Sequence, residues 1–123
     1  MPEILLVEDN PDTVDFLVRR LIEAGHVVRV ARNGLDAIRA VEDALPDVVV
    51  LDLNLPLLDG YEVCKRLRAA EATRLLPVVF VTAESEDRVE GLLDPATTVC
   101  LQKAIRSRTL LDAVARLLER PVG

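Results

Sequence analysis

Short apolar runs rich in β-branched residues alternate along the chain with segments of helical periodicity. The five runs, each predicted to form a strand, are Ile4 to Val7, Val27 to Val30, Val48 to Leu51, Val78 to Val81 and Thr98 to Leu101. They are apolar without regular alternation, which indicates a sheet whose two faces are both covered. They are also far shorter than the roughly 18 apolar residues that a membrane-spanning helix requires.

The segments between these runs repeat apolar residues at helical spacing, so that each predicted helix has one apolar face. The apolar positions are Val14, Leu17, Val18 and Leu21; Ile38, Val41 and Leu45; Val63, Cys64 and Leu67; Val89, Leu92 and Leu93; and Leu110, Leu111, Val114, Leu117 and Leu118. Asn10 is suited to cap the first helix, Pro11 to open its first turn and Gly25 to end it. Pro95 is expected to end the fourth helix at or before Asp94.

Five repeats of strand and helix predict parallel strands joined by right-handed crossovers, with helices on both faces of the sheet. The expected fold class is therefore an α/β sandwich. A chain of 123 residues has the size of one compact domain, and no internal repeat or linker divides it. We therefore expect a single domain over residues 1–123.

Composition narrows the classes of function. The formal net charge is −6 and aromatic residues make up 2% of the chain, which argues against direct nucleic-acid binding. Cys64 and Cys100 lack the partners of a zinc site or disulfide framework, and we expect both to be buried small apolar side chains. The sequence "MPEILLVEDN" lacks the basic segment of a secretory signal, so we expect a cytoplasmic protein without membrane contact.

Polar residues follow four of the five predicted strands. They are Glu8 and Asp9 after the first strand, Asp52 and Asn54 after the third, Thr82 after the fourth and Lys103 after the fifth. The second strand ends without an acid. Ligands of open parallel sheets bind beyond the carboxyl ends of the strands. If these four strands are neighbours, three carboxylates, a hydroxyl and an ammonium group converge on one pocket.

Three carboxylates in one partly desolvated pocket repel one another, and a hard divalent cation would offset that repulsion. Mg²⁺ prefers oxygen ligands from one or two carboxylates, retained waters and phosphate. Asp9, Asp52 and the main-chain carbonyl of Asn54 are the expected ligands, and Glu8 is expected to act through water.

Each residue also has a purely structural interpretation. Asp9 could simply cap the following helix, threonine is common at strand ends, and a lysine at such a position is usually a solvated charge. Asp52 is harder to explain in this way, because the next apolar helix face begins only at Val63. The chain has 13 arginines and 2 lysines, so Lys103 suggests a compact point charge, although Lys65 shows that lysine also occurs on an ordinary helix face.

Taken together, these residues resemble the receiver domain of two-component response regulators. The resemblance covers the whole chain and rests on "LLVEDN", "PDVVVLDLNLPLLDGYEVCKRLR", "PVVFVTA" and Lys103, in the order of that family. It implies a doubly wound five-stranded parallel sheet of order 2-1-3-4-5, a flavodoxin-like three-layer sandwich.

The resemblance also implies roles for the polar residues. Asp52 would accept a phosphoryl group from a phosphohistidine on a histidine kinase or phosphotransfer protein. Glu8 and Asp9 would position Mg²⁺, and Thr82 and Lys103 would contact phosphoryl oxygens. Such a domain is not an enzyme in the usual sense, although it is expected to catalyse its own phosphorylation and dephosphorylation. The surface from the fourth to the fifth helix would switch a downstream effector or output domain and could form a dimer.

Two departures from the family pattern affect that surface. Cys100 stands where the family commonly has an aromatic residue, and Ala104 stands where it favours proline, so the lysine loop is expected to differ. One competing hypothesis is a docking module that signals without phosphorylation. A second is a Mg²⁺-dependent phosphatase with an aspartyl-phosphate intermediate. It is less well supported, because Asn54 occupies the second position of the expected DxD pair and no cap domain is present.

Overall fold

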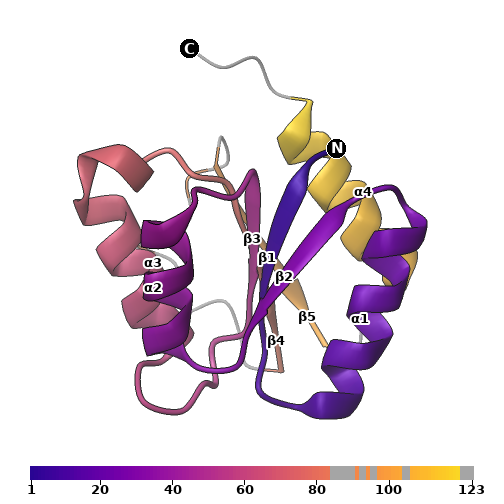
Figure 1. Cartoon of the computed structure of the whole chain (residues 1–123), viewed down its shortest axis with the longest axis horizontal. Helices are drawn as coiled ribbons and strands as arrows, with labels where there is room; N and C mark the ends of the chain where they lie inside the picture. Colours follow the sequence, from indigo (N-terminus) through magenta and orange to yellow (C-terminus); the bar gives the residue numbers. More distant parts are fainter. Residues whose placement is uncertain (84–90, 92–93, 95–96, 104–105, 120–123) are drawn as a thin grey trace.

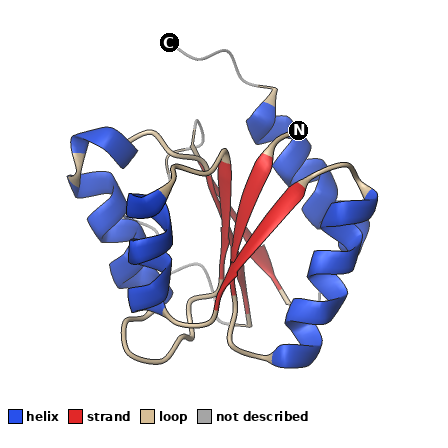
Figure 2. Cartoon of the chain, viewed as in Figure 1, coloured by secondary structure: helices blue, strands red, loops and turns tan. Residues whose placement is uncertain are grey.

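The computed structural model describes residues 1–83, 91, 94, 97–103 and 106–119. Its centre is a parallel sheet in the order β2-β1-β3-β4-β5, with helices on both faces (Figures 1 and 2). The strands are β1 (Glu3–Val7), β2 (Val27–Ala31), β3 (Val48–Leu51), β4 (Val78–Thr82) and β5 (Thr98–Gln102); the helices are α1 (Pro11–Glu23), α2 (Gly34–Asp43), α3 (Gly60–Ala69), the 3₁₀ turn η1 (Glu71–Thr73) and α4 (Ser107–Leu118). The predicted class and strand order are confirmed.

The core lies in two layers, one on each face of the sheet. Leu5 and Val7 of β1 belong to the layer under α2 and α3, while Ile4 and Leu6 belong to the layer under α1 and α4. Successive side chains of a strand point to opposite faces, and here both faces are buried. This is why the strand sequences are apolar throughout.

The first helix begins and ends as predicted. The Asn10 side chain accepts hydrogen bonds from the main-chain N–H groups of Asp12 and Thr13, at 2.9 and 3.1 Å. Pro11 occupies the first helical position, and Gly25 follows the helix with φ of 95°, a conformation that favours glycine. Asn10, rather than Asp9, is therefore the cap.

One predicted helix position is wrong. Leu45 was expected on the apolar face of the second helix, but α2 ends at Asp43 and Leu45 is 58% exposed. Pro46 disfavours helical geometry at the residue before it. The Arg29 guanidinium also donates hydrogen bonds to the main-chain oxygens of Ala40 (2.9 Å) and Ala44 (2.5 Å). These bonds satisfy carbonyl groups at the C-terminal end of the helix.

The predicted fourth helix, between β4 and β5, lies outside the described residues apart from single positions, and so does Ala104. The helix labelled α4 corresponds to the predicted fifth helix. The apolar positions Val89, Leu92 and Leu93 therefore stay predictions. In the part of the chain that the structure describes, no helix combines the length and the apolar character needed to cross a bilayer.

Candidate functional site

The strands bring the predicted polar residues to one edge of the sheet. Val7 pairs with Leu51 where β1 and β3 end, and Thr82 pairs with Gln102 where β4 and β5 end. The side chains that follow these positions therefore gather beyond the carboxyl ends of the strands, at the lower edge of the view in Figure 1.

Glu8, Asp9 and Asp52 form an acidic cluster at this edge. One carboxylate oxygen from each residue lies within 4.8 Å of the other two. Glu8 and Asp52 are 3% and 7% exposed, whereas Asp9 is open to solvent. Three carboxylate oxygens at this spacing, two of them shielded from water, are a donor set suited to a hard divalent cation.

Lys103 places its ammonium group between two of these carboxylates. Its Nζ donates to Glu8 Oε1 at 2.9 Å and to Asp52 Oδ2 at 3.1 Å. Its main-chain N–H donates to the Thr82 carbonyl at 2.7 Å, which fixes the chain just after β5 against the end of β4. The contact of Lys103 with Glu8 was not predicted, because 95 residues separate the two in sequence.

Main-chain N–H groups hold the two buried carboxylates. Glu8 Oε2 accepts from the N–H groups of Asp9 and Asn10 at 3.1 and 3.2 Å, and Asp52 Oδ1 accepts from that of Asn54 at 3.1 Å. Each carboxylate thus has one oxygen bound to the main chain and the other bound to Lys103. Glu8 is buried, and its role through water stays a prediction. The Asn54 carbonyl as a metal ligand stays a prediction.

Thr82 is the remaining polar residue predicted at this edge, and the two cysteines were predicted to be buried. Thr82 ends β4 and is fully buried, so its place at the edge agrees with the prediction, while its contact with a phosphoryl group stays a prediction. Cys64 is buried, as expected. Cys100 is only partly buried and packs against the core layer under α2 and α3.

Comparison with known proteins identifies the family in which this arrangement occurs. The family model described as response regulator receiver domain matches residues 4–115. The chain belongs to this family. It is 35% identical over 122 residues to the DNA-binding dual master transcriptional regulator RpaA of Synechocystis sp., covering 98% of this chain and 50% of RpaA. This receiver domain therefore spans about half the length of that relative.

Solved structures agree with the family. A putative response regulator from Chloroflexus aurantiacus has a TM-score of 0.87 and 31% identity, covering 97% of this chain and 98% of that one. The receiver domain of the sensor histidine kinase PA1611 from Pseudomonas aeruginosa has a TM-score of 0.83 and 29% identity over the same shares of the two chains. That structure has a magnesium ion coordinated in its active-site cleft. The acidic cluster is thus a candidate metal site of a receiver domain.

Burial and charge shift the proton affinities within the site. Burial raises the pKa of Glu8, and the negative charge of Asp52 adds to this rise. Hydrogen bonds from Lys103 and from the Asn10 N–H offset part of it. For Lys103, burial lowers the pKa, but the bonds and charges of Glu8 and Asp52 outweigh it, and the net pKa is raised. Lys103 therefore stays an ammonium ion at neutral pH.

The raised pKa of Glu8 predicts a pH-dependent cost to stability. Glu8 loses its proton at lower pH in the unfolded chain than in the folded one, so stability falls as pH rises from about 4.5 through the folded pKa. We expect Glu8→Gln to remove this loss and raise the melting temperature of the metal-free receiver domain at pH 7, with little change at pH 4. Thermal unfolding followed by circular dichroism at both pH values tests this. An equal shift at the two pH values would contradict it.

Two glycines at this edge were not recognised as part of the site. An added Cβ at Gly60 would lie 2.1 Å from the Asp52 main-chain oxygen, and one at Gly34 would lie 1.8 Å from that of Leu58. The sequence Asp59-Gly60 is typical of a turn before the third helix and indicates nothing more. A glycine directly after the helix cap Asp59 is the one signal available, and it does not reveal what lies opposite.

Proposed function

We propose that this receiver domain accepts a phosphoryl group on Asp52 from a phosphohistidine of a partner protein. The observation that carries the proposal is the position of Asp52, a nearly buried carboxylate at a strand end with one oxygen 3.1 Å from the Lys103 ammonium. Helix capping does not explain a carboxylate at this position, because Asp52 caps no helix of the described chain.

The chemistry follows from the side chains. A carboxylate oxygen of Asp52 bonds to phosphorus as the bond between phosphorus and the histidine nitrogen breaks, and the imidazole leaves. Lys103 would then pair with a phosphoryl oxygen and offset its charge, while the Thr82 hydroxyl would donate to another. The product is an acyl phosphate, which water hydrolyses readily, so the signal can be erased. Catalysis of both steps by the domain itself is part of the proposal.

Glu8, Asp9 and Asp52 fit Mg²⁺, and the magnesium ion in the PA1611 receiver domain supports that choice of metal. When bound, the metal would neutralise charge on the transferring group. In the absence of metal, Lys103 partly balances the acidic cluster. The main-chain carbonyl of Asn54 is proposed as a further ligand.

The partners are inferred from the family. A histidine kinase or histidine phosphotransfer protein would supply the phosphoryl group in the cytoplasm, and an effector protein or output domain would read the result. RpaA is a DNA-binding regulator, but the chain aligned here covers half of it, so any DNA-binding step would belong to another part or another protein. The expected switching and dimer surface includes the predicted fourth helix, which lies outside the described residues.

Incubation with acetyl phosphate and Mg²⁺ tests the proposal without a known kinase. We expect intact mass spectrometry to show the addition of one phosphoryl group, which chelation of the metal by EDTA prevents. After removal of the donor, the added mass is expected to disappear on standing and faster with Mg²⁺ present. An unchanged mass at every Mg²⁺ concentration would refute the proposal and favour a docking module that signals without phosphorylation.

A further inference from the structure

The helix α4 begins with two arginines that do not favour the helix itself. Arg106 is the N-cap and makes no side-chain hydrogen bond to the helix, and Arg108 lies in a first turn that holds no acid. By contrast, α1, α2 and α3 are capped by Asn10, Asn33 and Asp59, and each has an acid in its first turn. Short oxygen-bearing side chains are preferred at the N-cap, and the helix dipole disfavours cations there. Helix formation therefore does not explain Arg106 and Arg108.

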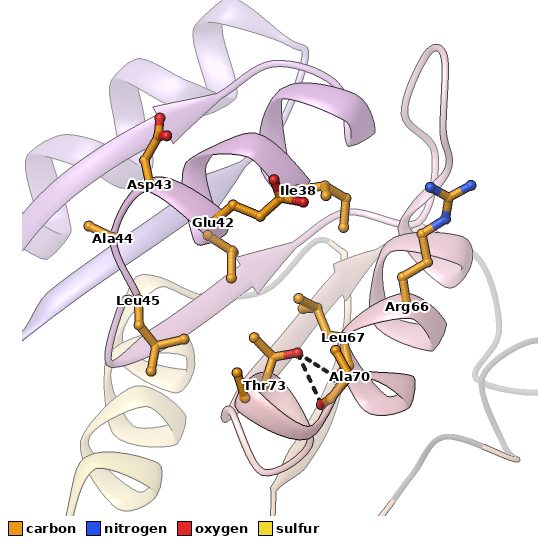
Figure 3. A pocket seen from close by; sticks show the side chains of 11 residues that line it. Ile38, Glu42, Asp43, Ala44, Leu45, Arg66, Leu67, Ala70 and Thr73 are labelled. Carbon is orange, nitrogen blue, oxygen red and sulfur yellow. Dashed lines mark hydrogen bonds between the residues drawn. The ribbon is translucent and has the colours of Figure 1, made fainter.

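Two other exposed arginines lie where the helix dipole favours a positive charge. Arg66 lies in the last turn of α3, at the groove between the ends of α2 and α3 (Figure 3). Arg116 lies in the last turn of α4. A cation at the C-terminal end of a helix offsets the negative pole of the dipole. Arg66 and Arg116 are thus explained by their own helices, and they serve below as controls.

Arg106 and Arg108 are free positive charges close to the proposed phosphoacceptor. Arg106 follows Lys103 by three residues, so their Cα atoms lie within about 11 Å of each other. Both arginines are exposed, and neither has an ion-pair partner among the described residues. The charge of Lys103, in contrast, is balanced by Glu8 and Asp52. The two arginines are therefore better placed than Lys103 to act on an anion outside the site.

A phosphoryl donor approaches this edge of the sheet against unfavourable charge. The chain has a formal net charge of −6, and Glu8, Asp9 and Asp52 lie together where the donor must react. An acyl phosphate or a phosphohistidine is itself an anion. Charges about 10 Å apart interact at low ionic strength, where the Debye length is about 30 Å. Exposed cations at the edge of a site raise the local concentration of an anionic reactant and its rate of association.

We propose that Arg106 and Arg108 draw anionic phosphoryl donors to Asp52 and favour dianionic donors over monoanionic ones. The donor reacts at Asp52, and the arginines act on its approach, so they are not catalytic residues. The inference rests on the proposed function and deepens it, because it assigns donor selectivity to residues outside the acidic cluster. Two exposed charges at this range are expected to change the association rate of a dianion about threefold to tenfold.

Phosphorylation rates with two small donors test the inference on the full chain with Mg²⁺ present. Acetyl phosphate is a dianion at neutral pH, and phosphoramidate is largely a monoanion. At low ionic strength, the double variant Arg106→Gln/Arg108→Gln is expected to react about threefold to tenfold more slowly with acetyl phosphate, and only about twofold to threefold more slowly with phosphoramidate. In 1 M salt, where the Debye length is about 3 Å, it should match the parent. Arg66→Gln/Arg116→Gln has the same net charge and should match the parent throughout.

Arg106→Asp separates the effect of charge from that of folding. Aspartate is a preferred N-cap, so this variant is expected to melt about 4 °C higher than the parent. It should nevertheless take up phosphate from acetyl phosphate more slowly, because it reverses a charge at the edge of the site. A lower melting temperature would show that Arg106 stabilises the helix, which contradicts the argument from capping.

The outcomes distinguish this inference from the proposed function. A phosphorylated parent with equal rates for the Arg106→Gln/Arg108→Gln and Arg66→Gln/Arg116→Gln variants would overturn the inference and leave the proposed function intact. Equal losses with the two donors, or a loss that persists in 1 M salt, would also overturn it. A parent that neither donor modifies would refute the proposed function and this inference with it.

Discussion

Asp52→Asn is expected to take up no phosphoryl group from acetyl phosphate under conditions in which the parent protein is fully modified. The amide has the shape of the carboxylate but lacks its charge and nucleophilic oxygen, so the bond to phosphorus cannot form. The measurement is the fraction of modified protein by intact mass spectrometry after equal incubation with Mg²⁺. A loss of at least about a hundredfold is expected, since Glu8, the other buried carboxylate bonded to Lys103, is proposed to hold the metal and not to attack phosphorus.

The folded state should survive this substitution. The Asn54 N–H donates to Asp52 Oδ1, and an amide oxygen can accept the same bond. Removal of one negative charge beside Glu8 also relieves repulsion in the metal-free cluster. The amide nitrogen cannot accept the bond that Lys103 now donates to Asp52 Oδ2, and the relieved repulsion offsets this loss. Thermal unfolding is therefore expected to show at most a small loss of stability, which separates a chemical effect from misfolding.

Asp15→Asn is the matched control. Asp15 is an exposed acid on α1 and lies outside the acidic cluster, so its variant should be phosphorylated at the parent rate. Unreduced labelling of Asp52→Asn would identify a different phosphoacceptor. Loss of labelling in Asp15→Asn as well would show that the assay reports net charge rather than the nucleophile.

The strands and the residues at their ends could be predicted from the sequence, because both depend on local sequence. Asp52 follows a fully apolar strand directly, and the parallel fold carries every such position to the same edge. Glu8 and Asp9 were predictable for the same reason. The family resemblance supplied the order of the strands, which the alternation of elements alone does not determine.

The contacts that complete the site depend on side chains distant in sequence. The sequence near Lys103 does not indicate that it bonds to Glu8 as well as to Asp52. The position of its ammonium group depends on how the strands β1, β3 and β5 are arranged in the sheet. Leu45 was misplaced for a related reason. Helical periodicity continued through it, but Pro46 and the distant Arg29 end the helix earlier.

Gly60→Ala is expected to be strongly destabilising. Its methyl group would lie 2.1 Å from the main-chain oxygen of Asp52 and 2.9 Å from the Cα of Leu53, so the backbone after β3 must move. Overpacking against a main chain that cannot relax costs about 3 kcal/mol, or roughly 10 °C in melting temperature for a domain of this size. Urea unfolding measures the first quantity and circular dichroism the second.

Gly25→Ala separates steric clash from backbone strain. Gly25 has φ of 95° and no atom within 4 Å of an added Cβ, so alanine there meets only the cost of a left-handed conformation, about 1 kcal/mol. Because the displaced oxygen belongs to Asp52 itself, the folded fraction of Gly60→Ala should also accept phosphate more slowly, whereas Gly25→Ala should match the parent. Equal destabilisation of the two variants would mean that the chain after β3 yields easily, and that Gly60 does not fix the position of the phosphoacceptor.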